Sequence, residues 1–344
     1  MQYNPSKIEK KDDDFSYQHK IVLYDIDKIM FQLSFFQPNT PESLFTDDKI
    51  DGNVIPVIKD NIHREFFIVD NAEPIIIYLQ NIKKFLDICK SYRKNVTIIT
   101  GQNSNSMIDL YKSMELSVIF LPLFNLMNYS KEKTYSRFYK ENTLEKKYLT
   151  LNRACKEHRE ELYEYLKDND LFKFGEYSFG WKNISSFDET IDKSQRHNYM
   201  VSIIDKLSFN QRCFLNFVIE TENVDYHIFE DKKIIPNFVS EKTYKMLLNG
   251  LPFIILGEPN LLENLKSYGI KTFSDYWDES YDLFPNRNNR FEKASSVLKD
   301  ICYTSDNRLR EIYNDTESIH KYNVELIDDI INNNIKILKE KINL

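Results

Sequence analysis

Residues 237–257 read NFVSEKTYKMLLNGLPFIILG, and they carry the clearest structural signal in the chain. Ser240 favours the start of a helix, and Tyr244, Leu247 and Leu248 then recur at the spacing of one helix face. Residues 252–256 form a short apolar run that is typical of a buried strand. A helix that leads into a buried strand is the repeating unit of a parallel sheet with crossover helices, so this stretch predicts an α/β fold.

The same alternation of strands and helices extends through the rest of the chain. In the first half it predicts strands at residues 21–26, 66–70, 96–100 and 117–120, with helices at 75–92 and 106–114. In the second half it predicts strands at 148–152, 171–174, 214–219 and 252–256. Residues 290–344 have helical spacing throughout, and a terminal helix of that kind could pack back across both halves.

The chain is expected to form two domains. Its 344 residues are more than one hydrophobic core usually supports. Between residues 128 and 147, charged and aromatic side chains interrupt the apolar periodicity, which indicates a boundary there. We therefore expect an N-terminal α/β domain at 1–145, a second α/β domain at 146–290 and C-terminal helices at 291–344.

Composition limits the classes of function that fit. The net charge of −7 gives no global attraction to nucleic acid or to an anionic membrane. The four cysteines lie far apart and form no CxxC pair, which argues against a zinc cluster or a disulfide framework. The N-terminal residues lack the apolar core of a secretory signal, and no run approaches the ~20 apolar residues of a membrane span. We expect a cytoplasmic protein without a membrane span.

The helix after Ser240 has the chemistry of a phosphate-binding site. The sequence lacks the GxGxxG pattern and the P-loop pattern of phosphate-binding enzymes. A helix N-terminus nevertheless offers free N–H groups to a phosphate, Lys242 adds a full positive charge, and Glu241 can accept from ribose hydroxyls. Taken alone, Ser240, Glu241, Lys242 and Thr243 fit an ordinary capped helix with solvated charges better than a phosphate site.

A resemblance to known enzymes favours the phosphate-binding interpretation. Residues 240–257 resemble the donor-site segment of α-1,3-fucosyltransferases, in which Tyr-Val-Thr-Glu-Lys, a helix and Val-Pro-Val-Val-Leu-Gly follow one another. Residues 262–282, LENLKSYGIKTFSDYWDESYD, extend the similarity to bacterial and viral glycosyltransferase-like proteins. The resemblance spans about residues 147–290 only. It implies a GT-B-like fold, with two Rossmann-like domains facing a cleft and the nucleotide-sugar donor bound by the C-terminal half.

The resemblance also implies donor-binding roles for residues at two strand ends. Asn152 and Arg153 follow the strand at 148–152 and Arg159 lies on the next helix, where they would approach the donor phosphates. Glu220 ends the strand at 214–219 and would bind sugar or ribose hydroxyls, with Glu222 or Asn223 nearby. The alternative for Glu220 is a solvated edge loop, and a solvated helix face is the interpretation we favour for Lys156 and Glu160.

An inverting sugar transfer needs a base that takes the proton of the acceptor hydroxyl. Asp70 and Glu73 follow the strand at 66–70 and are the candidates for this catalytic base, with His63 as a further possibility. Asp25 and Asp27 form an acid pair that could hold Mg²⁺ or Mn²⁺, but such pairs are common. We expect a metal-independent reaction without a cofactor, in which Lys242, Arg153, Arg159 and the helix N-terminus meet the charge of the leaving diphosphate.

The acceptor is left open between a glycan and a modified DNA base. The basic, aromatic segment at 131–147 also fits a non-enzymatic nucleic-acid-binding protein, although the overall acidity opposes that alternative. A glycosyltransferase that modifies DNA would combine both functions. The abundance of Ile, Lys and Asn suggests an AT-rich genome, which is compatible with a virus or a phage.

Overall fold

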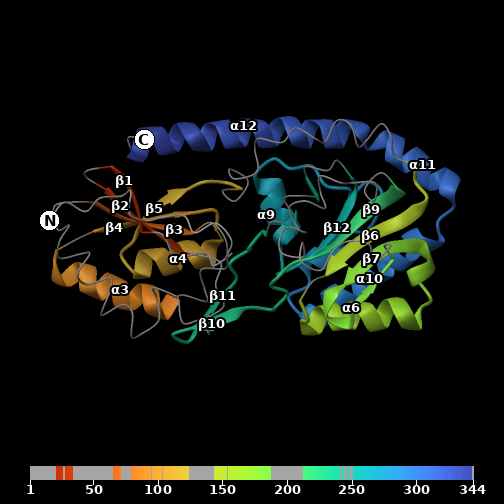
Figure 1. The fold of residues 1–344 in the computed structure, drawn as a ribbon, viewed down its shortest axis with the longest axis horizontal. Coiled ribbons are helices and arrows are strands. Elements are labelled where there is room, and N and C mark those ends of the chain that lie inside the picture. Colours follow the sequence, from red (N-terminus) through yellow and green to blue (C-terminus); the bar gives the residue numbers. More distant parts are fainter. Residues whose placement is uncertain are drawn as a thin grey trace.

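The protein has a mixed α/β fold with two separate sheets (Figure 1). The computed structural model describes residues 21–25, 28–33, 65–70, 79–93, 95–102, 104–123, 143–152, 154–186, 212–240, 242–243, 246–247 and 251–342. Within these ranges the strands form a five-stranded sheet in the N-terminal half, a second five-stranded sheet in the C-terminal half and a two-stranded hairpin.

The N-terminal sheet contains the predicted strands and one more. Its strands lie side by side in chain order: β1 (Ile21–Asp25), β2 (Lys28–Leu33), β3 (Glu65–Asp70), β4 (Val96–Thr100) and β5 (Ser117–Phe120). Strands β2 to β5 are parallel, and β1 pairs antiparallel with β2. The four predicted strands and the helices α3 (Leu79–Ser91) and α4 (Asn105–Ser113) are confirmed within a few residues, whereas β2 was not predicted.

Both faces of the N-terminal sheet are covered. Phe66 and Ile68 of β3 pack into a cluster with side chains of α3 and α4. Phe67, which alternates with them along the strand, packs on the opposite face in a cluster that Ile337 and Leu338 of α12 (Glu317–Ile342) cover. A parallel sheet needs cover on both faces, and here the far C-terminal end of the chain supplies part of it.

The C-terminal sheet has the order β12-β9-β6-β7-β8. The strands β6 (Lys146–Asn152), β7 (Gly175–Phe179), β9 (Cys213–Ile219) and β12 (Phe253–Leu256) are parallel, and the short β8 (Ile184–Ser185) is antiparallel at the edge. Three of the four predicted strands are confirmed. The prediction of a strand at 171–174 was wrong, because Phe172–Phe174 forms a 3₁₀ turn and the strand begins at Gly175.

The strand order creates a switch point between β6 and β9. From β6 the chain passes through α6 (Glu157–Asp168) to β7 on one side, whereas β9 and β12 lie on the other side of β6. The loops that leave β6 and β9 therefore diverge. In open α/β sheets ligands bind outside the carboxyl ends of the strands at such a point, which here is the end of β6 at Asn152 and the end of β9 at Ile219.

The predicted helical C-terminus is present as α10 (Arg287–Tyr303), α11 (Asp306–Asp315) and α12. Figure 1 shows α12 running along both halves of the molecule. Ile327 and Ile331 of α12 pack in the core of the C-terminal half, and Asn334 donates a 2.7 Å hydrogen bond to the carbonyl of Pro122 in the N-terminal half. In the part of the chain that is described, no helix is long and apolar enough to cross a membrane.

A hairpin from the C-terminal half also reaches the N-terminal half. It consists of β10 (His227–Phe229) and β11 (Lys232–Ile234), and Phe229 and Ile234 join the cluster under α3 and α4. Directly after it, Ile235 exchanges hydrogen bonds with Ser106 at 3.0 and 3.1 Å. Ser106 belongs to α4, close behind the carboxyl end of β4, so the two halves meet near this edge of the N-terminal sheet.

Candidate functional site

A buried carboxylate organises the helix start at the switch point. Glu220 directly follows β9 and is fully buried. Its Oε1 accepts hydrogen bonds from the backbone N–H of Ser240, at 3.1 Å, and from the hydroxyl of Thr243, and its Oε2 accepts from the N–H of Thr221 at 3.2 Å. The structure thus brings Glu220, Ser240 and Thr243 into direct contact, with Glu220 holding the helix start against the carboxyl end of β9.

Lys242 supplies a positive charge at this helix start. Lys242, Thr243, Met246 and Leu247 are helical, and the Ser240 hydroxyl accepts from the Lys242 N–H at 3.2 Å, as an N-cap does. The Lys242 ammonium lies 3.0 Å from the Thr221 hydroxyl and 3.4 Å from that of Ser240. Because Lys242 is half-buried whereas Ser240 and Thr243 are buried, it brings positive charge to the surface of this strand edge.

The neighbouring strand β6 contributes a buried amide. Asn152 ends β6 and is 2% exposed, and its Nδ2 donates to the Thr150 hydroxyl at 3.0 Å. Within the described ranges its Oδ1 accepts no hydrogen bond. A buried acceptor without a partner is uncommon in folded proteins and is a feature of ligand sites as well as of strained ones. Asn152 therefore lies at the predicted place, at the switch point beside the end of β9.

The start of α6 is fastened to the exit of β9. His158 is buried, and its Nε2 donates to the carbonyl of Glu220 at 3.2 Å. Burial, together with the charges of Arg159 and Lys156, lowers the pKa of His158 to about 3, so the imidazole is neutral. Arg159 is also buried and donates to the carbonyl of Ala154 at 3.2 Å, which places its guanidinium against the loop after β6.

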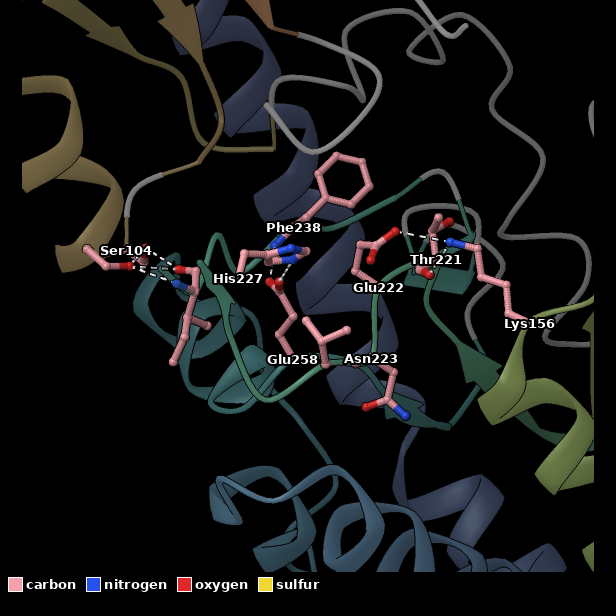
Figure 2. A network of polar contacts seen from close by, with 12 residues as sticks. Ser104, Lys156, Thr221, Glu222, Asn223, His227, Phe238 and Glu258 are labelled. Atoms are coloured by element: carbon pink, nitrogen blue, oxygen red, sulfur yellow. Dashed lines mark hydrogen bonds and ion pairs between the residues drawn. The ribbon is translucent and has the colours of Figure 1, made fainter. Parts of the chain in front are cut away.

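Two charged residues of the β6–α6 region differ in part from the expectation of a solvated face. Lys156 donates to the Thr221 carbonyl at 2.8 Å and pairs with Glu222 at 3.0 Å (Figure 2). Glu160 accepts from the indole N–H of Trp181 at 2.6 Å and pairs with Lys182. The expectation of a solvated face holds in part, because the side chains of Lys156 and Glu160 are still 35% and 37% exposed. Their partners come from the segments that follow β9 and β7, which helical periodicity cannot reveal.

A buried arginine that the sequence did not single out holds the loops after β9 and β12. Arg290 of α10 is 1% exposed. It donates to the carbonyl of Gly257 at 3.1 Å, to that of Val224 at 2.7 Å and to the Asn223 side chain at 3.2 Å. Fixed planar donors suit such a task. Arg290 therefore fixes the loops after β9 and β12 relative to α10. Nothing in the helical pattern around Arg290 distinguishes it in the sequence.

The acidic motif at 278–282 serves the fold. Glu279 accepts from the Phe273 N–H at 2.8 Å and from the Thr272 hydroxyl at 2.6 Å. Asp282 accepts from the N–H groups of Leu262 and Glu263, at 3.0 and 3.2 Å, and so caps the helix α9 (Leu261–Ser267). The motif that extends the resemblance therefore stabilises the connection after β12 and contributes no described side chain to the switch point.

A second buried carboxylate lies at the same strand edge. Glu258 follows β12 after Gly257, is 1% exposed, and accepts from the Phe238 N–H at 3.1 Å and from His227 Nε2 at 3.2 Å. Sequence reasoning missed both Glu258 and His227. The position of Glu258 after a strand matches that of Glu220 and could have revealed it, but the irregular stretch around His227 gives no periodic signal.

The remaining predicted residues lie elsewhere or outside the described part of the chain. Asp70 ends β3 of the N-terminal sheet, and only its backbone is described. Arg153, Glu241, Glu73 and His63 lie outside the described residues. Asp25 ends β1, and its partner in the acid pair, Asp27, is also outside them. The roles predicted for these residues stay predictions.

Comparison with known proteins gives little further information. No protein-family model and no curated protein matches the chain. Among solved structures, a mutant of T4 phage BGT in complex with UDP-glucose is similar over 80% of this chain and 85% of that chain, with 10% sequence identity and a TM-score of 0.28. A TM-score this low does not establish a common fold.

Proposed function

We propose that this protein is a GT-B-like glycosyltransferase that moves a sugar from a nucleoside-diphosphate sugar to an acceptor hydroxyl. One observation carries the proposal: Glu220, buried at the end of β9, holds Ser240 and Thr243 so that a helix N-terminus with Lys242 stands at the switch point of a parallel sheet. Ligands of open α/β sheets bind at this place, and a helix N-terminus with a lysine suits a diphosphate.

The contacts suggest separate tasks for the residues of the site. Lys242, Arg153 and the helix N-terminus would bind the diphosphate, and Glu241 would accept hydrogen bonds from the ribose. Asn152, whose Oδ1 accepts no hydrogen bond from the described residues, would bind a donor hydroxyl at the end of β6. Arg159 would shape or contact the same loop. Both oxygens of Glu220 already accept hydrogen bonds within the protein, so we assign it to positioning the helix.

The reaction would be an inverting displacement without a metal or a cofactor. The acceptor oxygen would attack the anomeric carbon while the bond to the diphosphate breaks, and Lys242 with the helix N-terminus would stabilise the departing charge. Two α/β domains, with a boundary near residue 145 and helices after residue 290, would enclose the substrates in a cleft. Asp70 and Glu73 of the N-terminal domain are the bases that the sequence indicates.

The nucleic-acid-binding alternative receives no support from the contacts at the end of its segment. Of residues 131–147, only 143–147 are described. Lys147 donates to the Thr304 carbonyl at 3.0 Å and pairs with Asp306, and Lys146 donates to the Lys173 carbonyl at 3.4 Å. These two lysines are engaged within the protein. A glycan and a modified DNA base both remain open as acceptors.

Binding of nucleoside diphosphates tests the proposal directly. We expect UDP, GDP or ADP to raise the melting temperature of the protein, because a ligand at 100 times its Kd adds about 2.7 kcal/mol of stability. Calorimetric titration with the nucleotide that binds should then show at least about 10-fold weaker binding to Lys242→Ala, since a charge-assisted contact contributes roughly 1.5–3 kcal/mol.

Lys167→Ala is the matched control, because Lys167 is an exposed helix lysine paired only with Glu164 among the described residues. It should bind the nucleotide like the wild type. Arg153→Ala should weaken binding as well, by less if the arginine contacts a single oxygen. Equal affinities of the wild type and Lys242→Ala would place the phosphates elsewhere in the molecule.

A further inference from the structure

His227 and Glu258 form a polar pair to which the proposed donor site assigns no role. His227 begins β10, and the carboxylate of Glu258 follows β12. The distance from His227 Nε2 to Glu258 Oε1 is 3.2 Å, and the side chains are 20% and 1% exposed. Figure 2 shows the imidazole directly against the carboxylate. The imidazole therefore reaches the surface while its carboxylate partner stays buried.

The pair has the geometry of an oriented base. Glu258 Oε2 accepts from the Phe238 N–H, which fixes the carboxylate, and an ionised carboxylate can only accept from the imidazole. Nε2 then carries the proton, and Nδ1 is the ring nitrogen that can accept one. In the described part of the chain, Nδ1 forms no hydrogen bond. Burial raises the pKa of Glu258, and the hydrogen bonds from His227 and Phe238 oppose this rise.

The pair is fastened to the proposed donor site. Glu258 binds the backbone of Phe238, and Glu220 binds the backbone of Ser240 two residues later. Carboxylates from the neighbouring strands β12 and β9 thus hold the same short segment, and His227 stands on the β12 side of the helix start. The same strand also reaches the N-terminal half, because Phe229, two residues after His227, packs in the core of that half. His227 is therefore placed where the donor side meets the N-terminal half.

We propose that His227, oriented by Glu258, is the general base of the sugar transfer, an inference that rests on the proposed function. Nδ1 of His227 takes the proton from the acceptor hydroxyl, and the acceptor oxygen forms a bond to the anomeric carbon. The bond from that carbon to the diphosphate oxygen breaks, and its electron pair leaves with the diphosphate towards Lys242. The imidazolium then returns the proton to water. Glu258 is a positioning residue that keeps the proton of the neutral imidazole on Nε2.

Donor hydrolysis and nucleotide binding, measured together, test the assignment. The probes are UDP-glucose, GDP-fucose and ADP-glucose with water as the acceptor, and the readout is released nucleoside diphosphate. We expect His227→Ala to bind the nucleoside diphosphate within twofold of the wild type and to lose about 100-fold or more in kcat, as expected for a lost general base. Imidazole added to His227→Ala should restore part of kcat, whereas pyrazole, a much weaker base of the same shape, should not.

Two further variants separate chemistry from structure. Ile228→Ala changes the next residue of β10, which is 70% exposed, and should keep the wild-type kcat. Glu258→Gln keeps the size of the side chain but no longer enforces the tautomer of His227. It should lower kcat with unchanged KM and move the pH profile of kcat, neither of which loss of packing alone would produce.

Chemical modification of His227 tests the assignment without any turnover, and it therefore applies even if donor hydrolysis is slow. Diethyl pyrocarbonate acylates a neutral, accessible imidazole nitrogen, and we expect it to modify His227 in the free protein. The nucleotide sugar that binds should protect His227 from modification. Modification that is equal with and without bound nucleotide sugar would overturn the assignment.

The outcomes distinguish this inference from the proposed function. If the wild type binds none of UDP, GDP and ADP, the proposed function fails and the role of His227 fails with it. If nucleotide binds but His227→Ala keeps the wild-type kcat while Asp70→Asn or Glu73→Gln loses it, the donor site stands and the base lies in the N-terminal half. Loss of kcat without rescue by imidazole would reduce His227 to a structural residue.

Discussion

At the scale of single residues, buried carboxylates organise the C-terminal half. Glu220, Glu258, Glu279 and Asp282 are all buried, and each accepts at least one backbone N–H from a loop or a helix start. Glu220 and Glu258 follow β9 and β12 directly or after one glycine, so the ends of the parallel strands set the positions of the loops. Backbone groups without a ladder partner need such acceptors when they are buried.

Asp282 gives this arrangement a testable pH dependence. Burial raises the pKa of Asp282 to about 6, from 3.8 in the unfolded chain, and the N–H groups of Leu262 and Glu263 only partly offset it. Below pH 3.8 the carboxyl is protonated in both states, and between 3.8 and 6 only the unfolded state loses the proton. The contribution of Asp282 to stability therefore falls as pH rises through this window, by up to roughly 3 kcal/mol.

In Asp282→Asn the amide oxygen can still accept from both N–H groups but does not ionise. The free energy of unfolding of this variant relative to the wild type should therefore rise between pH 4 and pH 7, as measured by urea unfolding. Asp278→Asn is the control, because the Lys293 hydrogen bond lowers the pKa of Asp278 to about 2 and that carboxylate stays ionised in this range. A pH-independent difference for Asp282→Asn would contradict the argument.

At the scale of elements, the β10–β11 hairpin joins the two halves. Phe229 is 6% exposed and packs under α3 and α4, whereas Ile228, its neighbour in β10, is 70% exposed. Phe229→Ala should cost roughly 3–5 kcal/mol of unfolding free energy, because it removes a buried ring and leaves a cavity. Ile228→Ala should change it by less than about 0.5 kcal/mol, as surface substitutions usually do. Denaturant unfolding of both variants measures the contrast, and equal losses would show that the hairpin is not anchored by Phe229.

The elements also show what local sequence can predict. Runs such as residues 96–100 and 214–219 are strands because they are apolar and buried, and the pattern alone reveals them. The run at 171–174, LFKF, is also mostly apolar but forms a 3₁₀ turn. Pairing with β6 begins only at Gly175, opposite Tyr148, where a Cβ would collide with the Tyr148 ring. Because glycine gives no hydrophobic signal, the sequence predicted this strand at 171–174 instead of at Gly175–Phe179.

The candidate site was predictable only in part. Ser240, Thr243 and Lys242 were predicted from a helix-start pattern, and Glu220 from its place at a strand end, and the structure brings these four together. The sequence could not predict which of these residues would bind a ligand and which would position the helix. That distinction depends on which oxygens of Glu220 already accept hydrogen bonds within the protein. His227 and Arg290 act across sequence separations of more than 30 residues, and no local pattern encodes such contacts.

At the scale of the whole molecule, the two halves depend on each other for their cores. The last turns of α12 cover a face of the N-terminal sheet, while its earlier residues Ile327 and Ile331 pack in the C-terminal half. The hairpin closes the opposite face of the N-terminal sheet, which α3 and α4 also cover. The halves are therefore linked by two connections on different faces of one sheet.

The arrangement of the halves leads to a prediction about the location of the chemistry. If the leaving diphosphate is neutralised by Lys242, Arg153 and a helix N-terminus, transfer needs no divalent ion and should persist in EDTA. The competing site is the acid pair Asp25 and Asp27, of which Asp25 ends β1, and it would place a metal in the N-terminal half. Release of nucleoside diphosphate from a bound donor, with and without EDTA, separates the two sites. Turnover that EDTA abolishes and Mg²⁺ or Mn²⁺ restores, lost in Asp25→Asn but kept in Lys242→Ala, would move the chemistry to the N-terminal half.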